Sequence, residues 1–191
     1  MPKILFVNAC PRENSRTLSL ARCALSFLQG EVEVCNLYDM PLQPLDAEGL
    51  SVRGAAFASK DFSAACFAPA RQFVSADIIV IAAPYWDMMF PSVLKTYLES
   101  VTVNGLAFAY NTRGIPEGRC AAKRLIYVTT AGGPIINNFG FDYVASVSRT
   151  FFGISDVRFL CAERLDLQGA DPIAILEKAK QAIPAILSEE R

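Results

Sequence analysis

The sequence predicts an α/β fold with a doubly wound, five-stranded parallel sheet in the order 2-1-3-4-5 and helices on both faces, in three layers (α/β/α). Apolar runs at residues 3–8, 78–83 and 124–130 are typical of strands covered on both faces. Longer segments with helical periodicity alternate with these runs, which indicates a parallel sheet joined by right-handed crossovers. A length of 191 residues suits one domain, which we expect to span residues 1–191.

The first third of the chain predicts two strands and one helix. Residues 3–8 form the first strand, and apolar residues at helical spacing predict a helix over 16–29. Polar and apolar residues alternate over 31–37, as in an outer strand with one face toward water. Residues 38–58 are rich in proline and glycine, so we expect them to be irregular.

The middle of the chain predicts a helix over 60–75, the buried strand at 78–83 and a helix over 92–104. Pro84 ends the strand because it has no N–H for the sheet ladder. Pro91 suits the first turn of the following helix, where an N–H would have no partner.

The last third begins with an excursion over 105–123, which contains a short apolar segment followed by glycine and proline. The strand at 124–130 then leads into the tight loop 130–134. The remaining expected elements are a helix at 141–152, a strand at 157–161 and a final helix at 171–187.

Composition narrows the possible functions. The formal net charge is −1, so the chain has no electrostatic signature of nucleic-acid or membrane binding. The absence of histidine excludes Ser-His-Asp and Cys-His catalysis. The six cysteines show no CxxC spacing, so we expect reduced thiols and no metal site. The N-terminus shows no signal-peptide pattern, and we expect a cytoplasmic protein.

Three unusual loops converge in the expected topology. Strands 1, 3 and 4 are neighbours, so the loops at their carboxyl ends, residues 9–17, 85–90 and 130–134, meet at one edge of the sheet. Open α/β sheets bind their ligands at this edge. The convergence indicates a binding site more strongly than any single loop does.

The loop over residues 9–17 predicts an anion site. Asn14, Ser15 and Thr17 lie at a helix N-terminus beside Arg12 and Arg16, where free amides and the helix dipole favour a phosphate. The loop matches neither GxGxxG nor GxxxxGK[ST]. A simpler interpretation stays open, in which Ser15 is a helix N-cap and both arginines are solvated.

The other two loops predict a platform for a flat ring. Residues 85–90 offer aromatic and thioether faces, and Gly132 and Gly133 let a ligand approach the backbone closely. The alternatives are core packing for the first loop and a plain turn for the second. Flavin suits both loops, since its faces stack and its polar edge accepts hydrogen bonds. The negative charge of Asp87 suits a reduced, anionic flavin poorly, so its side chain either points away or selects something in the substrate.

Three segments carry a resemblance to a known family: CPRENSRT, APYWDMMFPSVLKTYLESVTVNGLAFAYNTRGIPEG and IYVTTAGGP. Together with FFGISDVRFLCAE, they resemble the flavodoxin-like FMN-dependent NAD(P)H oxidoreductases, in the azoreductase and NAD(P)H quinone reductase branch, from about Lys3 to Glu163. The resemblance implies a flavodoxin-like sheet, bound FMN and NAD(P)H as electron donor. It also implies a quinone, azo compound or similar small acceptor, and a homodimer with active sites at its interface.

The resemblance implies roles for individual residues as well. The first loop would hold the FMN phosphate, residues 85–88 would line the isoalloxazine, and residues 130–133 would bond its pyrimidine edge. Tyr110, Phe151 and Asp87 would lie near the substrate. No catalytic side chain is needed, because the flavin performs the hydride chemistry. The implied cofactor-binding residues are Cys10, Ser15, Arg16, Thr17, Pro84, Tyr85, Trp86, Asp87, Met88, Thr130, Ala131, Gly132 and Gly133.

The chain departs from the family in two places. The azoreductases commonly have serine near Ala9 and Cys10, and Asn-Phe where this chain has Asp87 and Met88. The first departure affects one phosphate or ribityl contact. The second leaves the substrate class open, because a methionine makes a more adjustable wall than phenylalanine. The choice between NADH and NADPH is also open.

Two other functions remain as alternatives. Cys10 begins a C-x5-R-T motif that resembles the phosphate loop of low-molecular-weight protein tyrosine phosphatases, in which a thiolate is the nucleophile. Pro11 lacks an amide for the phosphate and Glu13 adds a negative charge, so both count against a phosphatase. The second alternative is a non-catalytic FMN electron carrier, which the near-neutral charge does not favour.

Overall fold

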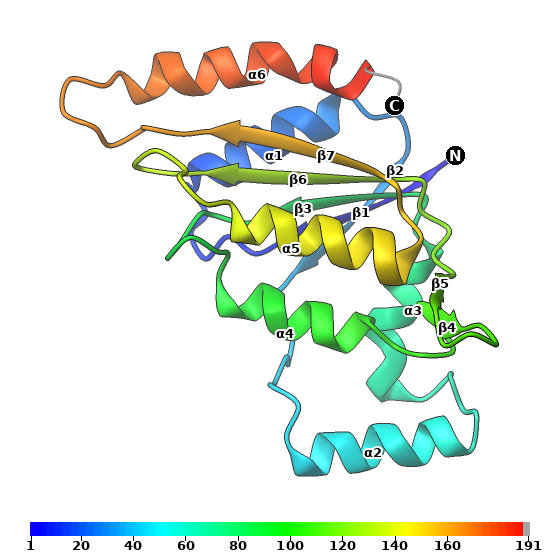
Figure 1. The fold of residues 1–191 in the computed structure, drawn as a ribbon. Helices are drawn as coiled ribbons and strands as arrows, with labels where there is room; N and C mark the ends of the chain where they lie inside the picture. The colour runs from blue at the N-terminus through cyan, green and yellow to red at the C-terminus, as the bar shows by residue number, and fades with distance from the viewer. Residues whose placement is uncertain (189–191) are drawn as a thin grey trace.

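A five-stranded parallel sheet forms the centre of the computed structural model, which describes residues 1–188 (Figure 1). The strands pair in the order β2-β1-β3-β6-β7, and every pairing in this sheet is parallel. This is the predicted order 2-1-3-4-5, which confirms the fold class. The strands are β1 (Lys3–Asn8), β2 (Glu31–Asn36), β3 (Ile78–Ala82), β6 (Arg124–Thr130) and β7 (Asp156–Ala162).

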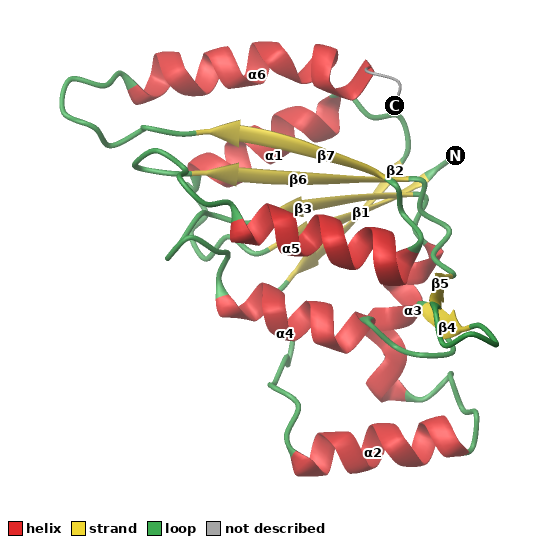
Figure 2. Cartoon of the chain, viewed as in Figure 1, coloured by secondary structure: helices red, strands yellow, loops and turns green. Residues whose placement is uncertain are grey.

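Helices cover both faces of the sheet and produce three layers (Figure 2). One face packs against α1 (Arg16–Ser26) and α6 (Pro172–Ser188). The other packs against α3 (Ala68–Ser75), α4 (Ser92–Val101) and α5 (Phe139–Val147). Within residues 1–188, no helix combines the length and apolarity that a membrane crossing requires.

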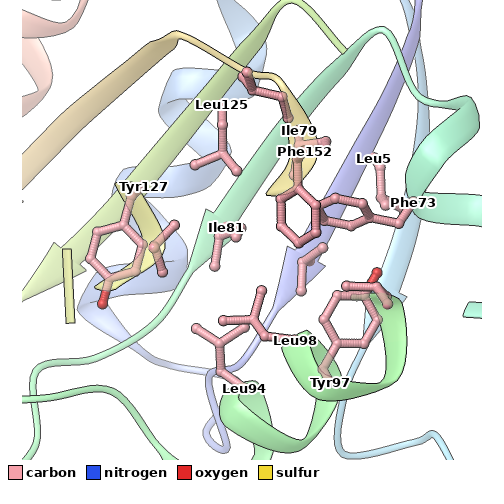
Figure 3. Packing of buried hydrophobic residues seen from close by; sticks show 14 of the residues in the cluster. Leu5, Phe73, Ile79, Ile81, Leu94, Tyr97, Leu98, Leu125, Tyr127 and Phe152 are labelled. Atoms are coloured by element: carbon pink, nitrogen blue, oxygen red, sulfur yellow. The ribbon is translucent and has the colours of Figure 1, made fainter. Parts of the chain in front are cut away.

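Alternate residues of β1, β3 and β6 enter opposite layers of the core. In β3, Ile79 and Ile81 join the cluster that contains α4 and α5, whereas Val80 and Ala82 join the cluster that contains α1 and α6. Figure 3 shows the first cluster, in which side chains from β1, β3, β6, α3 and α4 surround Phe152. Burial of a large aliphatic side chain stabilises the fold by about 1.5–3 kcal/mol, so these layers hold the strand ends firmly.

Helix α2 (Ala47–Ala58) corrects the expectation of an irregular segment over residues 38–58. The Asp46 carboxylate caps the helix by accepting a hydrogen bond from the Gly49 N–H at 2.8 Å. None of its residues is buried, so the apolar period that normally indicates a helix is missing. In Figure 1, α2 lies beyond α4, on the side away from the sheet.

A small hairpin occupies the excursion over residues 105–123. Its strands, β4 (Phe108–Tyr110) and β5 (Pro116–Gly118), are antiparallel and form a separate two-stranded sheet. Figure 1 shows the hairpin at the end of the molecule where the parallel strands begin, opposite their arrowheads.

Two predicted helices are divided in the structure. A 3-10 turn at Ala65–Phe67 precedes α3, so the helix expected over 60–75 begins later than predicted. The helix expected over 141–152 becomes α5 followed by a π-helical turn at Ser148–Phe152. Gly153 ends this turn with a φ of 73°, a left-handed conformation that glycine adopts without a steric penalty.

Candidate functional site

A cavity of about 480 Å³ lies at the carboxyl edge of the sheet, where the loops after β1, β3 and β6 meet. Small-molecule sites commonly have volumes of about 300–1,000 Å³. The structure thus brings together the three loops whose strands the sequence placed side by side. The lining residues are Pro11, Arg12, Asn14, Ser15, Arg16, Thr17, Pro84, Tyr85, Trp86, Thr130, Gly132 and Asp166. We call this cavity the crevice.

The N-terminus of α1 forms one end of the crevice. Ser15 is its N-cap, because the Ser15 hydroxyl accepts a hydrogen bond from the Leu18 N–H at 3.3 Å. The N–H groups of Arg16 and Thr17 have no acceptor within residues 1–188. The capping role considered for Ser15 is therefore correct, and it leaves two amides of the first turn available for an anion.

A pair of buried hydroxyl groups forms the floor of the crevice. Thr17 Oγ1 and Thr130 Oγ1 lie 2.7 Å apart and share a hydrogen bond. Both side chains are buried, so the bond ties the first turn of α1 to the end of β6. The bond thereby fixes the position of the α1 end of the crevice relative to the β6 end.

Asp166 is a crevice residue that the sequence reasoning missed. Its carboxylate accepts two hydrogen bonds from Arg16, at 2.8 Å and 3.1 Å, in a bidentate ion pair. The hydrogen bond from Arg16 lowers the pKa of Asp166. Asp166 follows β7, whose carboxyl end lies at the same edge of the sheet as the three chosen loops. That position was the signal that could have identified it.

In the glycine loop after β6, the carbonyls of Gly132 and Gly133 are used in backbone hydrogen bonds, whereas their N–H groups remain available to a ligand. The carbonyl of Gly132 accepts from the Asp166 N–H at 2.9 Å, and that of Gly133 accepts from the Arg164 N–H at 3.0 Å. Neither glycine N–H has an acceptor within the described chain. A Cβ on Gly132 would lie 2.3 Å from Asp166 Oδ2, so any larger residue here would displace the Asp166 carboxylate.

The loop after β3 closes with a two-residue turn. Trp86 and Met89 exchange backbone hydrogen bonds of 2.9 Å and 2.8 Å, and Asp87 and Met88 between them have φ values of 50° and 65°. Two consecutive positive φ angles are typical of a type I′ turn, which strongly prefers glycine, asparagine or aspartate. Met88 is therefore held in a strained conformation, of a kind that clusters at functional sites.

Aromatic side chains from this loop form one wall of the crevice. The Tyr85 hydroxyl donates to the Asn137 carbonyl at 2.8 Å, which fixes the ring. Trp86 is 45% exposed and lines both the crevice and a second cavity of about 500 Å³. The second cavity is lined by Tyr38, Trp86, Asp87, Met89, Phe90, Pro91, Ser92, Val93 and Lys95.

Cys10 does not reach the crevice. Its thiol is buried in the core and points to the Ala82 carbonyl, and its N–H donates to Asn8 Oδ1 at 3.0 Å. Burial raises the pKa of the thiol to about 11. A phosphatase nucleophile needs an accessible thiolate with a lowered pKa. The buried thiol therefore does not support the phosphatase alternative, and Cys10 does not line the crevice as a predicted cofactor contact would.

Four other predicted cofactor residues lie beside the crevice without lining it. Ala131 is buried under the glycine loop, whereas a Cβ on Gly133 would point into open space. Asp87 lines the second cavity, and Met88 is half-exposed with its sulfur 3.9 Å from the Asn137 amide nitrogen. The remaining eight predicted cofactor residues all line the crevice.

Tyr110 and Phe151 lie far from the crevice of their own chain. Tyr110 belongs to β4 at the opposite end of the sheet, and Phe151 lies in the π-helical turn beside it (Figure 1). The ring of Phe108 contacts both, with centroid distances of 5.4 Å to Tyr110 and 4.9 Å to Phe151. Within one chain, these residues therefore do not meet a ligand bound in the crevice.

Comparison with known proteins establishes the family. A family described as having a flavodoxin-like fold matches residues 2–187, nearly the whole chain. The chain belongs to this flavodoxin-like family. The resemblance seen in the sequence is thereby confirmed.

Individual relatives of this flavodoxin-like chain match over most of their length. An FMN-dependent NADH:quinone oxidoreductase of Coprothermobacter proteolyticus is 31% identical over 188 residues, which cover 90% of each chain. A protein of Clostridium beijerinckii with the same description is 31% identical over 189 residues, which cover 94% of each chain. An azoreductase structure from Bacillus anthracis superimposes with a TM-score of 0.83 at 22% identity, covering 97% of this chain and 98% of that chain. The last comparison supports the fold.

Proposed function

We propose that this flavodoxin-like protein is an FMN-dependent oxidoreductase that passes electrons from NADH or NADPH through bound FMN to a quinone, azo compound or similar small acceptor. The observation that carries the proposal is the crevice, where a free helix N-terminus, the glycine loop with its free Gly132 amide and an exposed tryptophan surround one cavity. The relatives described as FMN-dependent NADH:quinone oxidoreductases support the same activity.

The chemistry of the crevice fits FMN at both ends. At one end, the N–H groups of Arg16 and Thr17 lack acceptors, and the phosphate of FMN supplies oxygens that suit them. At the other end, the N–H groups of Gly132 and Gly133 also lack acceptors, and the pyrimidine edge of the flavin supplies carbonyls. Between them, Trp86 offers an exposed aromatic surface to the ring.

The residues of the chain would position and shield the cofactor. When bound, FMN supplies the hydride chemistry, and the protein needs no nucleophile of its own. Asp166 would hold the Arg16 guanidinium at the phosphate end, where its remaining N–H groups can donate. The Thr17–Thr130 bond would keep the distance between the phosphate and ring ends fixed, which favours a preorganised site.

We also propose that the active unit is a homodimer. A groove of about 700 Å³ lies between α2, α4 and α5, and α2 contributes Leu50 and Phe57 to its mainly apolar wall. Both side chains are well exposed in the single chain. A second copy in this groove would bury them and would bring its own Tyr110 and Phe151 toward the crevice. The distance of Tyr110 and Phe151 from their own crevice supports this arrangement.

The test uses Trp86, which is the only tryptophan of the chain. We expect FMN to quench the Trp86 emission with one cofactor per chain, and the desalted protein to stay yellow. NADH or NADPH under nitrogen should then bleach the flavin band, and a quinone should restore it. A colourless protein with unquenched emission after FMN addition would contradict the proposal. As a control, Trp86→Phe should remain yellow while losing the emission.

A further inference from the structure

The rim beside the crevice carries one carboxylate without a counter-charge. Asp87 is exposed, and within residues 1–188 its side chain takes part in no ion pair or hydrogen bond. Lys95 lines the same cavity, but its ammonium is paired with Glu99 and lies 5.7 Å from the centroid of the Tyr143 ring. Two arginines line the crevice: Arg16 is paired with Asp166, and Arg12 lines the crevice but not the cavity beside Asp87. The negative charge of Asp87 is therefore left uncompensated.

The backbone keeps this carboxylate in place. Asp87 occupies the first central position of the type I′ turn, and the two Trp86–Met89 hydrogen bonds close the turn on both sides. Aspartate and asparagine tolerate the left-handed conformation at this position better than most residues. The turn thus fixes the Cα–Cβ direction of Asp87 without depending on the charge of its side chain.

The cavity beside Asp87 suits a flat aromatic molecule. Tyr38, Trp86 and Phe90 contribute aromatic side chains to its wall, and its volume of about 500 Å³ is that of a small-molecule site. Trp86 belongs to this cavity and to the crevice. A flat molecule that reaches the crevice past Trp86 must therefore pass close to the Asp87 carboxylate.

We propose that Asp87 is a specificity-determining residue, which makes the protein favour uncharged and cationic aromatic electron acceptors over anionic ones. The inference rests on the proposed function, because it concerns the acceptor. An anionic substituent near Asp87 is repelled, whereas an uncharged one is not. Discrimination of this kind depends on a repulsive element, and added salt should weaken it because Asp87 is exposed.

The test compares the wild type with Asp87→Asn, which removes the charge and still suits the turn. The holoenzyme is assayed with 1,4-naphthoquinone and with 1,4-naphthoquinone-2-sulfonate. We expect the substitution to raise kcat/KM for the sulfonate, relative to that for the uncharged quinone, about fivefold at low salt. The gain should shrink at high salt.

A second measurement needs no turnover. Equilibrium dialysis of the sulfonate against the oxidised holoenzyme, without NADH or NADPH, gives its dissociation constant. We expect Asp87→Asn to lower this constant about fivefold, since a charge at the rim acts on binding itself. The proposal is overturned if Asp87→Asn leaves either the relative kcat/KM or the dissociation constant for the sulfonate unchanged.

Glu31→Gln provides the matched control. It removes the same charge from an exposed position at the amino end of β2, opposite the crevice, and should change neither quantity. A wild-type holoenzyme that reduces neither quinone would refute the proposed function instead. The dialysis measurement would still test Asp87 in that event.

Discussion

At the residue scale, the proposed function gives Arg16 two partners, Asp166 and the FMN phosphate. Its guanidinium carries five N–H groups, and two of them are directed at Asp166. The ion pair removes much of the conformational freedom of a long side chain, so an arriving phosphate would meet donors that are already oriented. The pair is also partly exposed, so its own contribution to stability is small. In the proposed site, the main effect of the ion pair is to orient the Arg16 guanidinium toward the phosphate.

Arg16→Ala tests this positioning. We expect the dissociation constant for FMN to rise about tenfold, because a partly exposed charge-assisted hydrogen bond contributes roughly 1–2 kcal/mol. Trp86 quenching measures the constant. Arg22→Ala on the same helix is the control, since Arg22 is exposed and does not line the crevice. Equal FMN affinity in Arg16→Ala and the wild type would remove Arg16 from the phosphate site.

Gly133→Val tests the ring end of the crevice. A Cβ at this position meets no atom within 4 Å, so we expect the melting temperature to stay near that of the wild type. The valine side chain would cover the free amides and should abolish flavin binding, measured as loss of the yellow colour after desalting. Undiminished FMN affinity in a folded variant would contradict the placement of the flavin ring at this loop.

At the element scale, β7 is fixed at both ends. At its carboxyl end, residues 164–166 bond to the glycine loop. At its amino end, Asp156 accepts from Arg124 at 2.6 Å and also pairs with Arg158, which is 3% exposed. The two arginines continue to α6, where they donate to the Leu187 and Ile186 carbonyls. Asp166, which lines the crevice, therefore follows a strand whose ends are both held by hydrogen bonds.

Asp156→Asn tests whether the ion pairs of Asp156 hold the amino end of β7 in place and stabilise the fold. Burial alone would raise the pKa of Asp156, but hydrogen bonds from Arg158 and Arg124 outweigh it and lower the pKa. The carboxylate therefore stabilises the fold above its unfolded pKa of about 3.9, and this contribution is lost as the pH falls through the folded pKa. We expect the variant to lose about 2 kcal/mol at pH 7 and less in acid, measured by urea unfolding.

The exposed pair of Glu177 with Lys180 supplies the control for this prediction. Glu177→Gln should change the free energy of unfolding by less than about 0.5 kcal/mol at either pH, because exposed ion pairs contribute little. If Asp156→Asn and Glu177→Gln lowered the free energy of unfolding equally, the buried ion pairs of Asp156 would contribute no more than an exposed pair.

The sequence predicted the elements that have a buried face and missed those that lack one. The central strands β1, β3 and β6 were expected because burial on two faces requires mainly apolar residues, and β2 was expected from its alternation of polar and apolar residues. Helix α2 was missed because none of its residues is buried. Among site residues, the loop positions after β1, β3 and β6 were identified from topology. Topology also places Asp166 at this edge, after β7, but its ion pair with Arg16 depends on a contact across the fold that the sequence does not reveal.

At the scale of the whole molecule, the crevice and the aromatic pair Tyr110 and Phe151 lie at opposite ends of the sheet (Figure 1). A symmetric pair of chains can bring the crevice of one copy to the aromatic end of the other. In the proposed homodimer, the exposed α2 and the apolar groove beside it would form this contact. That residues 1–191 form a single domain stays a prediction.

Leu50→Glu tests the homodimer. Leu50 lines the groove and is exposed, so a charge there should split a dimer into monomers without unfolding the chain. Light scattering after size-exclusion chromatography measures the mass, and circular dichroism checks the fold. Val52→Glu is the matched control, since Val52 is equally exposed on α2 but does not line the groove. A monomeric wild type, or dimers of equal strength in both variants, would contradict the proposed interface.

The close approach of Gly132 to Asp166 restricts how this protein can diverge. A methyl group at position 132 would overlap the Asp166 carboxylate, and a displaced carboxylate would release Arg16. The residues at positions 16, 132 and 166 therefore depend on one another structurally, although they are distant in the chain. A descendant with a larger residue at 132 would have to displace the Asp166 carboxylate, and such a lineage would have to find another way to orient its arginine.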